Sequence, residues 1–153
     1  MLKPGSPAPE VVLLDQHGIP FRLASLCGNH AVVLYFYPKD ETRVCTLESC
    51  MFRDAHAAIA ALGAVVIGIS ADTPTSHLDF ATHHRLPFRL LSDPAGAAYL
   101  AFGLKDFMGL KQRATFVIDG SGVIRSAISN RLLASKHVRG ALAALRDQRL
   151  ARS

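Results

Sequence analysis

The chain alternates between short, continuous apolar runs and longer segments in which apolar residues recur every three or four positions. Two runs are almost wholly apolar and rich in β-branched or aromatic residues, at Ala31–Tyr37 and Val65–Ser70. Runs of this length without polar alternation predict strands that are buried on both faces of a sheet. Shorter runs predict three further strands, at Val11–Leu14, Ile19–Leu23 and Phe88–Leu91.

Helical spacing predicts four helices between and after these strands. The first two span Thr42–Leu62 and Thr73–His84, and in the second we expect Leu78, Phe80 and Ala81 to face the core. The other two follow Asp93-Pro94 and Ser135, whose side chains are suited to cap a helix N-terminus.

Two β-rich runs near the end of the chain, Ala114–Asp119 and Val123–Ser129, flank Gly120-Ser121-Gly122 and predict a hairpin. Strands that alternate with helices indicate parallel pairing through crossovers, and the hairpin adds antiparallel strands. We therefore expect an α/β thioredoxin-like fold, with a mixed central sheet flanked by helices and a single domain over residues 1–153.

Composition and charge exclude several classes of protein. Half of the residues are hydrophobic and 19% are charged, which excludes a disordered chain, a collagen-like repeat and a disulfide scaffold. The net charge of +5 arises largely between Arg125 and Ser153, where seven lysines and arginines face one acidic residue, Asp147. These basic residues are spaced out and have no aromatic neighbours for base stacking, so we expect a solvated helix face and no nucleic-acid partner.

No membrane or export signal is visible in the sequence. The most apolar long stretch, Ala57–Ala71, has 15 residues and is interrupted by two glycines, whereas a spanning helix needs about 20 apolar residues. The first ten residues contain three prolines and lack the apolar core of a signal peptide. We expect a cytoplasmic protein that does not bind membranes, in which cysteines are more often reactive than structural.

The segment that carries most of the candidate chemistry is Tyr35–Cys50, YFYPKDETRVCTLESC. A buried strand leads through Pro38 into a polar loop, and Thr42 as N-cap would place Cys45 in the first turn of the next helix. Free backbone N–H groups and the positive end of the helix dipole stabilise a thiolate over a thiol there, and Arg43 adds a cation. The alternative is a buried and inert cysteine.

A second cysteine, Cys50, follows five residues later. On an intact helix the two Cα atoms would be about 8.6 Å apart, beyond the limit of about 7 Å for a disulfide. Cys50 packed against the sheet is therefore plausible while the helix is folded. The spacing also differs from C-x-x-C, so a thioredoxin-type dithiol is not expected.

YPKDETRVCTLESC resembles the active-site segment of peroxiredoxins, most closely the bacterioferritin-comigratory (peroxiredoxin Q) subfamily. The family pattern P-x-x-x-T-x-x-C is met by Pro38, Thr42 and Cys45. Downstream, RATFVIDGSGVIR, from Arg113 to Arg125, resembles the segment that supplies the family's active-site arginine. The resemblance covers nearly the whole chain.

This resemblance implies a thiol peroxidase. Cys45 would attack hydrogen peroxide or an organic hydroperoxide and become a sulfenic acid, and Cys50 would condense with it to an intramolecular disulfide. Thioredoxin or a similar dithiol would restore both thiols. Thr42 and Arg113 would bind the thiolate and the peroxide, and Pro38 would shield the sulfur. The resemblance implies no metal, haem or flavin, and we expect a monomer or a weak homodimer.

The chain departs from the subfamily pattern at a few positions. Arg43 and Val44 stand where proline and glycine are common, and Gly103–Arg113 is shorter than usual. We interpret Cys27, where the family usually has no cysteine, as structural, and Glu48 as a partner that holds the loop or the active-site arginine.

Two other functions use the same residues. A redox sensor or chaperone would use Cys45 and Cys50 without efficient turnover, and steady-state peroxide consumption separates it from a peroxidase. A metal site could combine these cysteines with His56, His83 and His84. The spacings match neither a zinc knuckle nor the three-residue cysteine spacing of thioredoxin-fold copper chaperones, so we expect no metal.

Overall fold

The computed structural model describes residues 1–26, 28–130 and 133–152, with the backbone alone for 149–152. Its strands are β1 (Val12–Leu14), β2 (Pro20–Arg22), β3 (Ala31–Phe36), β4 (Ala64–Ser70), β5 (Arg89–Ser92), β6 (Ala114–Ile118) and β7 (Ile124–Ser129). Its helices are α1 (Arg43–Ala61), α2 (Pro74–His83), α3 (Ala97–Ala101), α4 (Ala134–Arg152) and the short 3₁₀-helix η1 (Leu23–Leu26).

The described strands form one mixed sheet in the order β2-β1-β5-β4-β3-β6-β7. The central strands β3, β4 and β5 are parallel, whereas β6 pairs antiparallel with β3 and continues into the β6–β7 hairpin. At the other edge, β1 is antiparallel to β5 and pairs with β2. The predicted mixed sheet, its parallel crossovers and its hairpin are thus confirmed.

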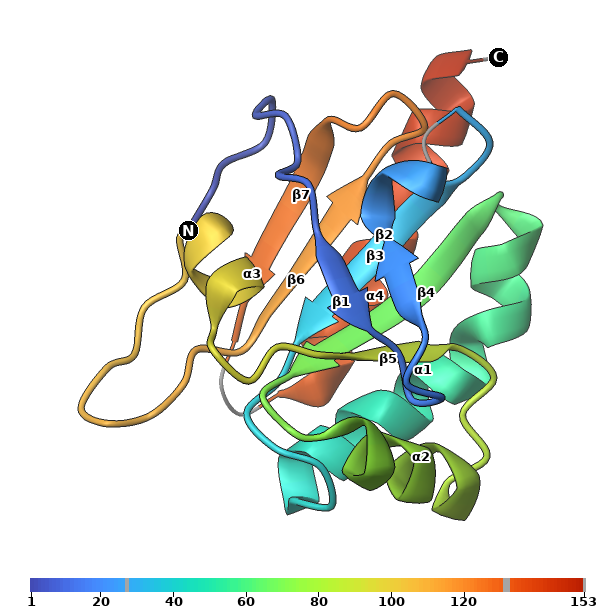
Figure 1. Cartoon of the computed structure of the whole chain (residues 1–153). Helices are drawn as coiled ribbons and strands as arrows, with labels where there is room; N and C mark the ends of the chain where they lie inside the picture. The colour runs from blue at the N-terminus through green and yellow to red at the C-terminus, as the bar shows by residue number, and fades with distance from the viewer. Residues whose placement is uncertain (27, 131–132, 153) are drawn as a thin grey trace.

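The sheet separates two apolar cores. Helices α1, α2 and α4 cover one face, and α3 packs on the other (Figure 1). Side chains of β3 alternate between the two cores: Val33 and Tyr35 point toward α1, and Leu34 and Phe36 toward α3. This explains why β3 lacks polar positions, because each of its faces is covered.

Contacts of Tyr35, a residue of β3, hold α1 against the sheet. The Tyr35 hydroxyl lies 2.8 Å from Ser49 Oγ on α1, and the Tyr35 ring stacks on Phe52 with 4.7 Å between centroids. The ring passes over Gly68 of β4, where an added Cβ would lie 2.8 Å from Tyr35 Cζ and from Leu90 Cδ2. Glycine is needed at this position because real Cβ atoms do not approach other heavy atoms so closely.

The inward face of α2 differs from the prediction at one position, since Phe80 and Ala81 are buried as expected. Leu78 is 39% exposed, and the fully buried side chain beside it is His77. A histidine is stable there because both ring nitrogens have partners, the carboxylate of Asp40 and the main-chain carbonyl of Leu91. Periodicity alone assigned the inward position to the more apolar residue, and this was wrong.

The predicted caps of α3 and α4 have different outcomes. Asp93 accepts hydrogen bonds from the backbone N–H groups of Ala98 and Tyr99, so it stabilises the start of α3 as expected. Ser135 does not cap α4, which begins one residue earlier, at the buried Ala134. Its hydroxyl accepts a hydrogen bond from Arg139 one turn later.

The two longest described helices, α1 and α4, contain 19 residues each and pack against one another. Both are amphipathic and bury only one side. No helix in the described part of the chain combines the length and the apolar composition needed to cross a membrane.

Candidate active site

The candidate nucleophile lies at the start of α1, directly after the central strand β3. Thr42 is the N-cap residue of α1, with an extended backbone (φ −83°, ψ 155°), which confirms the predicted helix start, although its side chain makes no capping hydrogen bond. Cys45 therefore lies in the first turn, and its side chain is completely buried. The free N–H groups of this turn and the helix dipole favour negative charge on its sulfur.

Sheet register brings Arg113 to this cysteine. Arg113 immediately precedes β6, and the first residue of β6, Ala114, pairs with Phe36, the last residue of β3. The arginine is thus held beside the turn that follows β3. Its Nη2 donates to Cys45 Sγ at 3.1 Å, and its Nη1 donates to Glu48 Oε1 at 2.9 Å.

Charge in this site is buried and paired. Burial raises the pKa of Glu48 to about 7, although the Arg113 guanidinium opposes the rise. Burial alone would lower the pKa of Arg113, but the charges of Glu48 and Cys45 outweigh it and raise that pKa. Arg113 therefore remains a permanent cation beside the sulfur.

The second oxygen of Glu48 faces a histidine from α4. Glu48 Oε2 has no hydrogen-bond partner and lies 3.6 Å from His137 Nδ1. His137 Nε2 donates to the Asn130 carbonyl at 2.6 Å, and Nδ1 lies 2.8 Å from Thr115 Oγ1. Burial lowers the pKa of His137; the Asn130 carbonyl opposes this, and Arg113 lowers it further.

Of the other predicted site residues, Thr42, Pro38 and Cys50 form no hydrogen bond with the sulfur in the described part of the chain. The Thr42 hydroxyl donates to the Lys39 carbonyl at 2.7 Å, so its contact with the thiolate stays a prediction. Pro38 is half-buried in the bend after β3. Cys50 is half-buried on α1, and neither it nor Cys45 is in a disulfide. Cys27 lies outside the described residues.

A second buried network fixes the loop that leads to Cys45. The backbone N–H of Asp40 donates to Asp72 Oδ2 at 2.8 Å, and its carboxylate accepts a hydrogen bond from the Tyr37 hydroxyl. The same carboxylate lies 2.7 Å from His77 Nδ1, while His77 Nε2 donates to the Leu91 carbonyl at 3.0 Å. The loop is thereby tied to α2 and β5.

Sequence reasoning missed these supporting residues. Asp40 lies in the YPKDETRVCTLESC segment but received no role, and neither His77 nor His137 was among the predicted site residues. Their spacing from the cysteine carries no recognisable signal, because the contacts arise only when α2 and α4 pack on the sheet. Glu48, interpreted as a partner of the active-site arginine, does pair with it.

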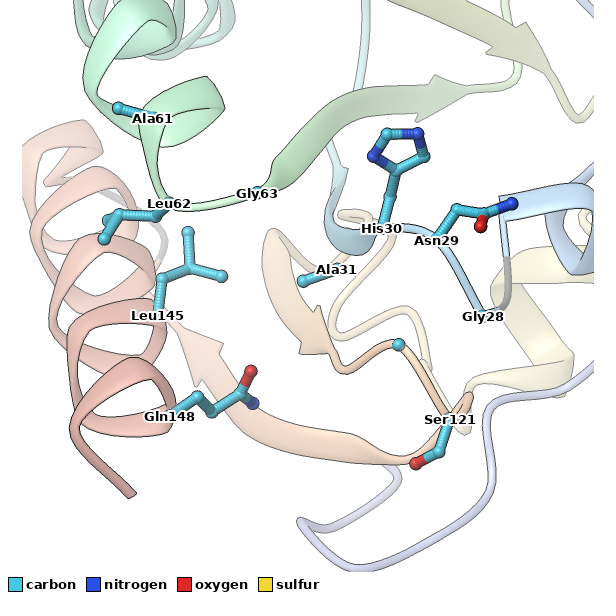
Figure 2. Close-up of a pocket in the computed structure, with 11 residues that line it drawn as sticks. Gly28, Asn29, His30, Ala31, Ala61, Leu62, Gly63, Ser121, Leu145 and Gln148 are labelled. Atoms are coloured by element: carbon cyan, nitrogen blue, oxygen red, sulfur yellow. The ribbon is translucent and has the colours of Figure 1, made fainter. Parts of the chain in front are cut away.

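Two pockets show where small molecules could approach. Arg113 lines a pocket of about 310 Å³ together with Lys105, Phe107, Gln112 and Ser129. A pocket of about 560 Å³ lies at the opposite end of the sheet, between the start of β3, the end of α1, the β6–β7 turn and α4 (Figure 2). Among the described residues, its lining has no cysteine, lysine, arginine or carboxylate, so it lacks the chemistry of the Cys45 site.

Comparison with known proteins places this geometry in a family. Residues 4–127 match the model of the AhpC/TSA family. The chain is 41% identical over 136 residues to the chloroplastic peroxiredoxin Q of Sedum lineare, covering 88% of this chain and 73% of that protein. It is 39% identical over 151 residues to the peroxiredoxin Bcp of Bacillus subtilis, covering 94% of each. It spans 63% of the length of the Populus jackii peroxiredoxin Q.

Solved structures agree with the sequence relatives. The crystal structure of peroxidoxin BcpB from Mycobacterium tuberculosis superposes with a TM-score of 0.90 at 36% identity, covering 96% of this chain and 98% of that one. The predicted thioredoxin-like fold is therefore confirmed. The chain belongs to the AhpC/TSA family and, within it, to the peroxiredoxin Q and Bcp group of thiol peroxidases.

Proposed function

We propose that this peroxiredoxin reduces hydrogen peroxide and organic hydroperoxides with Cys45 as the nucleophile and Cys50 as the resolving thiol. The observation that carries the proposal is the 3.1 Å contact between Arg113 Nη2 and Cys45 Sγ at the start of α1. A permanent cation and a helix N-terminus both favour the thiolate, which is the reactive form of cysteine.

In the first step, the Cys45 thiolate attacks one oxygen of the peroxide, and the O–O bond breaks. The sulfur becomes a sulfenic acid, and the other oxygen leaves as an alcohol, or as water, after taking up a proton. Negative charge moves from the sulfur to the departing oxygen during this step. Arg113 is positioned to stabilise that charge, and the buried site gives the interaction more strength than it would have in water.

In the second step, the Cys50 thiol attacks the sulfenic sulfur, releases water and forms a disulfide between the two residues. A dithiol reductant then exchanges with this disulfide and leaves with the oxidising equivalents. We propose thioredoxin or a similar protein as that reductant and the cytoplasm as the compartment.

Substrate access supports a role for small and moderately apolar hydroperoxides. Arg113, whose guanidinium contacts the buried sulfur, is one of the residues that line the pocket of about 310 Å³, so a peroxide in that pocket would lie next to this residue. Phe107 provides an apolar wall beside the polar side chains of Lys105 and Gln112. This combination suits a hydroperoxide with a short alkyl chain.

Replacement of Cys45 by serine tests the proposal. A serine hydroxyl is not ionised at neutral pH, so Cys45→Ser is expected to abolish peroxide consumption with a thioredoxin system while the circular dichroism spectrum stays unchanged. Cys50→Ser is the matched control, because it should keep the first oxidation and lose only repeated turnover. Appreciable turnover by Cys45→Ser would show that another group is the nucleophile. A wild type that oxidises once and does not turn over with reductant would instead indicate a peroxide sensor.

A further inference from the structure

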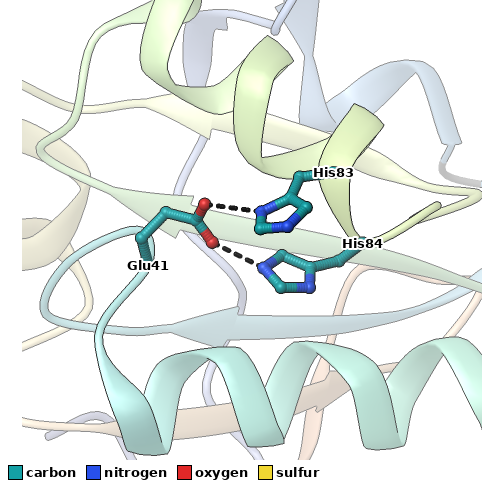
Figure 3. Close-up of side chains that lie close together, drawn as sticks. All are labelled: Glu41, His83 and His84. Atoms are coloured by element: carbon teal, nitrogen blue, oxygen red, sulfur yellow. Dashed lines mark hydrogen bonds and ion pairs between the residues drawn. The ribbon is translucent and has the colours of Figure 1, made fainter.

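Three side chains that the peroxidase reaction does not use meet beside the loop that leads to Cys45. Glu41 lies in that loop, and His83 and His84 lie at the end of α2 (Figure 3). Glu41 Oε2 is 2.8 Å from His83 Nδ1, and Glu41 Oε1 is 2.5 Å from His84 Nε2. One ligand atom from each residue lies within 4.8 Å of the other two.

Two imidazoles and a carboxylate are a donor set that zinc takes in proteins, with a fourth position left for water. Zinc bonds of about 2.0–2.2 Å in a tetrahedral site place neighbouring donor atoms about 3.3 Å apart. The present nitrogen–oxygen distances of 2.8 and 2.5 Å are shorter because hydrogen bonds now join these atoms. A metal ion would replace the two bridging protons, and the side chains would adjust from their present arrangement, in which the ligand atoms lie within 4.8 Å of one another, to the separation of a tetrahedral site.

The burial of His84 and the backbone conformation of Glu41 support a metal site rather than a chance contact on the surface. His84 is mostly buried, with a side chain 17% exposed, whereas Glu41 and His83 are open to solvent, so an ion can enter. Glu41 adopts a left-handed backbone (φ 60°), which is unfavourable for a residue other than glycine. Both chain neighbours of Glu41 are fixed. Asp40 is hydrogen-bonded to Asp72, and Thr42 is the N-cap residue of α1.

The other cluster of possible ligands in the described part of the chain lacks this openness. Asp40, Asp72 and His77 also lie close together, but Asp40 and His77 are buried and hydrogen-bonded to other groups. Near the first cluster, the Arg53 guanidinium donates to the His84 carbonyl and to Asp54. The positive charge of Arg53 is thus paired with the Asp54 carboxylate, and its guanidinium also binds a main-chain carbonyl.

Contrary to the expectation of no metal that the cysteine spacings gave, we propose that Glu41, His83 and His84, without a cysteine, bind a zinc ion, and that the bound ion clamps the loop before α1 to the end of α2. Building on the proposed function, the clamp should slow disulfide formation between Cys45 and Cys50, because that step requires the first turns of α1 to move. The attack of Cys45 on peroxide needs no such movement and should keep its rate.

Direct titration tests the site without any dependence on peroxidase activity. The probe is Zn²⁺ added to the full-length chain with its three cysteines replaced by serine, followed by calorimetry. Co²⁺ as a second probe should give the visible absorption of a tetrahedral site. One ion per chain is expected, with an affinity at least about tenfold lower in His83→Ala. His17→Ala, which removes an exposed histidine on the β1–β2 turn, is the control and should bind as the parent does. No saturable binding, or equal affinities for all three proteins, would overturn the site.

Rapid-quench mass spectrometry tests the clamp on the wild-type cysteines. With zinc, compared with a chelator, the sulfenic acid should form at the same rate and the disulfide several-fold more slowly. His83→Ala should be insensitive to zinc. If zinc slows His83→Ala equally, the ion acts through the thiolates and the clamp is wrong. If zinc binds the cluster without changing the disulfide rate, the clamp is also wrong. If no disulfide forms even with chelator, the resolving role of Cys50 fails, and the titration alone decides the metal site.

Discussion

At the scale of single residues, Arg113 connects the sulfur of Cys45 with the carboxylate of Glu48 through two different nitrogens. A lysine has one nitrogen and cannot reproduce this planar arrangement of donors. Arg113→Lys is therefore expected to slow the reaction with peroxide by about tenfold or more, because one electrostatic donor in such a site contributes about 3 kcal/mol.

Stopped-flow or quenched-flow oxidation of the reduced protein measures this effect. Arg125→Lys is a suitable control, because Arg125 pairs with Asp119 on the hairpin and its side chain is half-exposed. Equal rates for Arg113→Lys and the wild type would mean that another cation, such as Arg43, serves the sulfur.

Glu48 makes stability depend on pH. Its pKa rises from 4.5 to about 7 on folding, mainly through burial. Between these values the folded protein holds a proton that the unfolded chain has released, so stability falls as pH rises from about 4.5 to 7. The loss attributable to this group is at most roughly 3 kcal/mol.

Glu48→Gln removes this titration and is expected to flatten the pH dependence of the unfolding free energy over the same interval. Urea denaturation at several pH values provides the measurement, with Glu10→Gln as the control for an exposed carboxylate. A wild-type profile that matches the Gln variant at every pH would contradict the burial argument.

At the scale of the element, α1 must be compatible with two states of the protein, the reduced form and the form with a disulfide between Cys45 and Cys50. The intact helix keeps the Cα atoms of Cys45 and Cys50 about 8.6 Å apart, too far for the disulfide. Between them, Glu48 and Ser49 are buried and hydrogen-bonded, so opening the first turns gives up those contacts. Phe52, fully buried and stacked on Tyr35, marks where the firmly packed part of the helix begins.

Hydrogen exchange should reveal this division. In the disulfide form, we expect faster exchange across residues 46–52, with continued protection of residues 55–62, because local opening affects the less stable end of an element. The reduced protein is the reference state. Peptide mapping that finds no bond between Cys45 and Cys50, or a disulfide form with unchanged exchange, would refute local unwinding and direct attention to a disulfide between two chains.

At the scale of the whole molecule, the buried pair of Asp40 and His77 joins the active-site loop, α2 and β5. Removing His77 takes one hydrogen-bond partner from the buried Asp40 carboxylate, which then keeps only the hydroxyls of Tyr37 and Ser76. His77→Ala is expected to lower the free energy of unfolding by about 3 kcal/mol and to slow peroxide reduction, because the loop before Cys45 loses its anchor. Chemical denaturation and rate measurements on the same samples check both effects, with His17→Ala as the control. Unchanged stability would show that Asp72 and Tyr37 hold the loop unaided.

Local patterns along the chain were sufficient for the elements and for the two motifs. Apolar runs identified β3 and β4, since a strand with both faces covered buries nearly all of its side chains and therefore consists mostly of apolar residues. Thr42 and the polar loop before it identified the start of α1, since threonine is a common N-cap residue, but the expected capping hydrogen bond is absent because the Thr42 hydroxyl donates to the Lys39 carbonyl. That residues 1–153 form one domain stays a prediction.

Tertiary structure alone decided the partners. Arg113 meets Cys45 because the start of β6 pairs with the end of β3, and no local pattern encodes that register. His77 replaced Leu78 in the core because two distant groups satisfy both of its ring nitrogens. His137 reaches Glu48 only through the packing of α4. A sequence records which side chains can be buried or ionised, whereas their pairing depends on distances that exist only after the sheet and its helices have assembled.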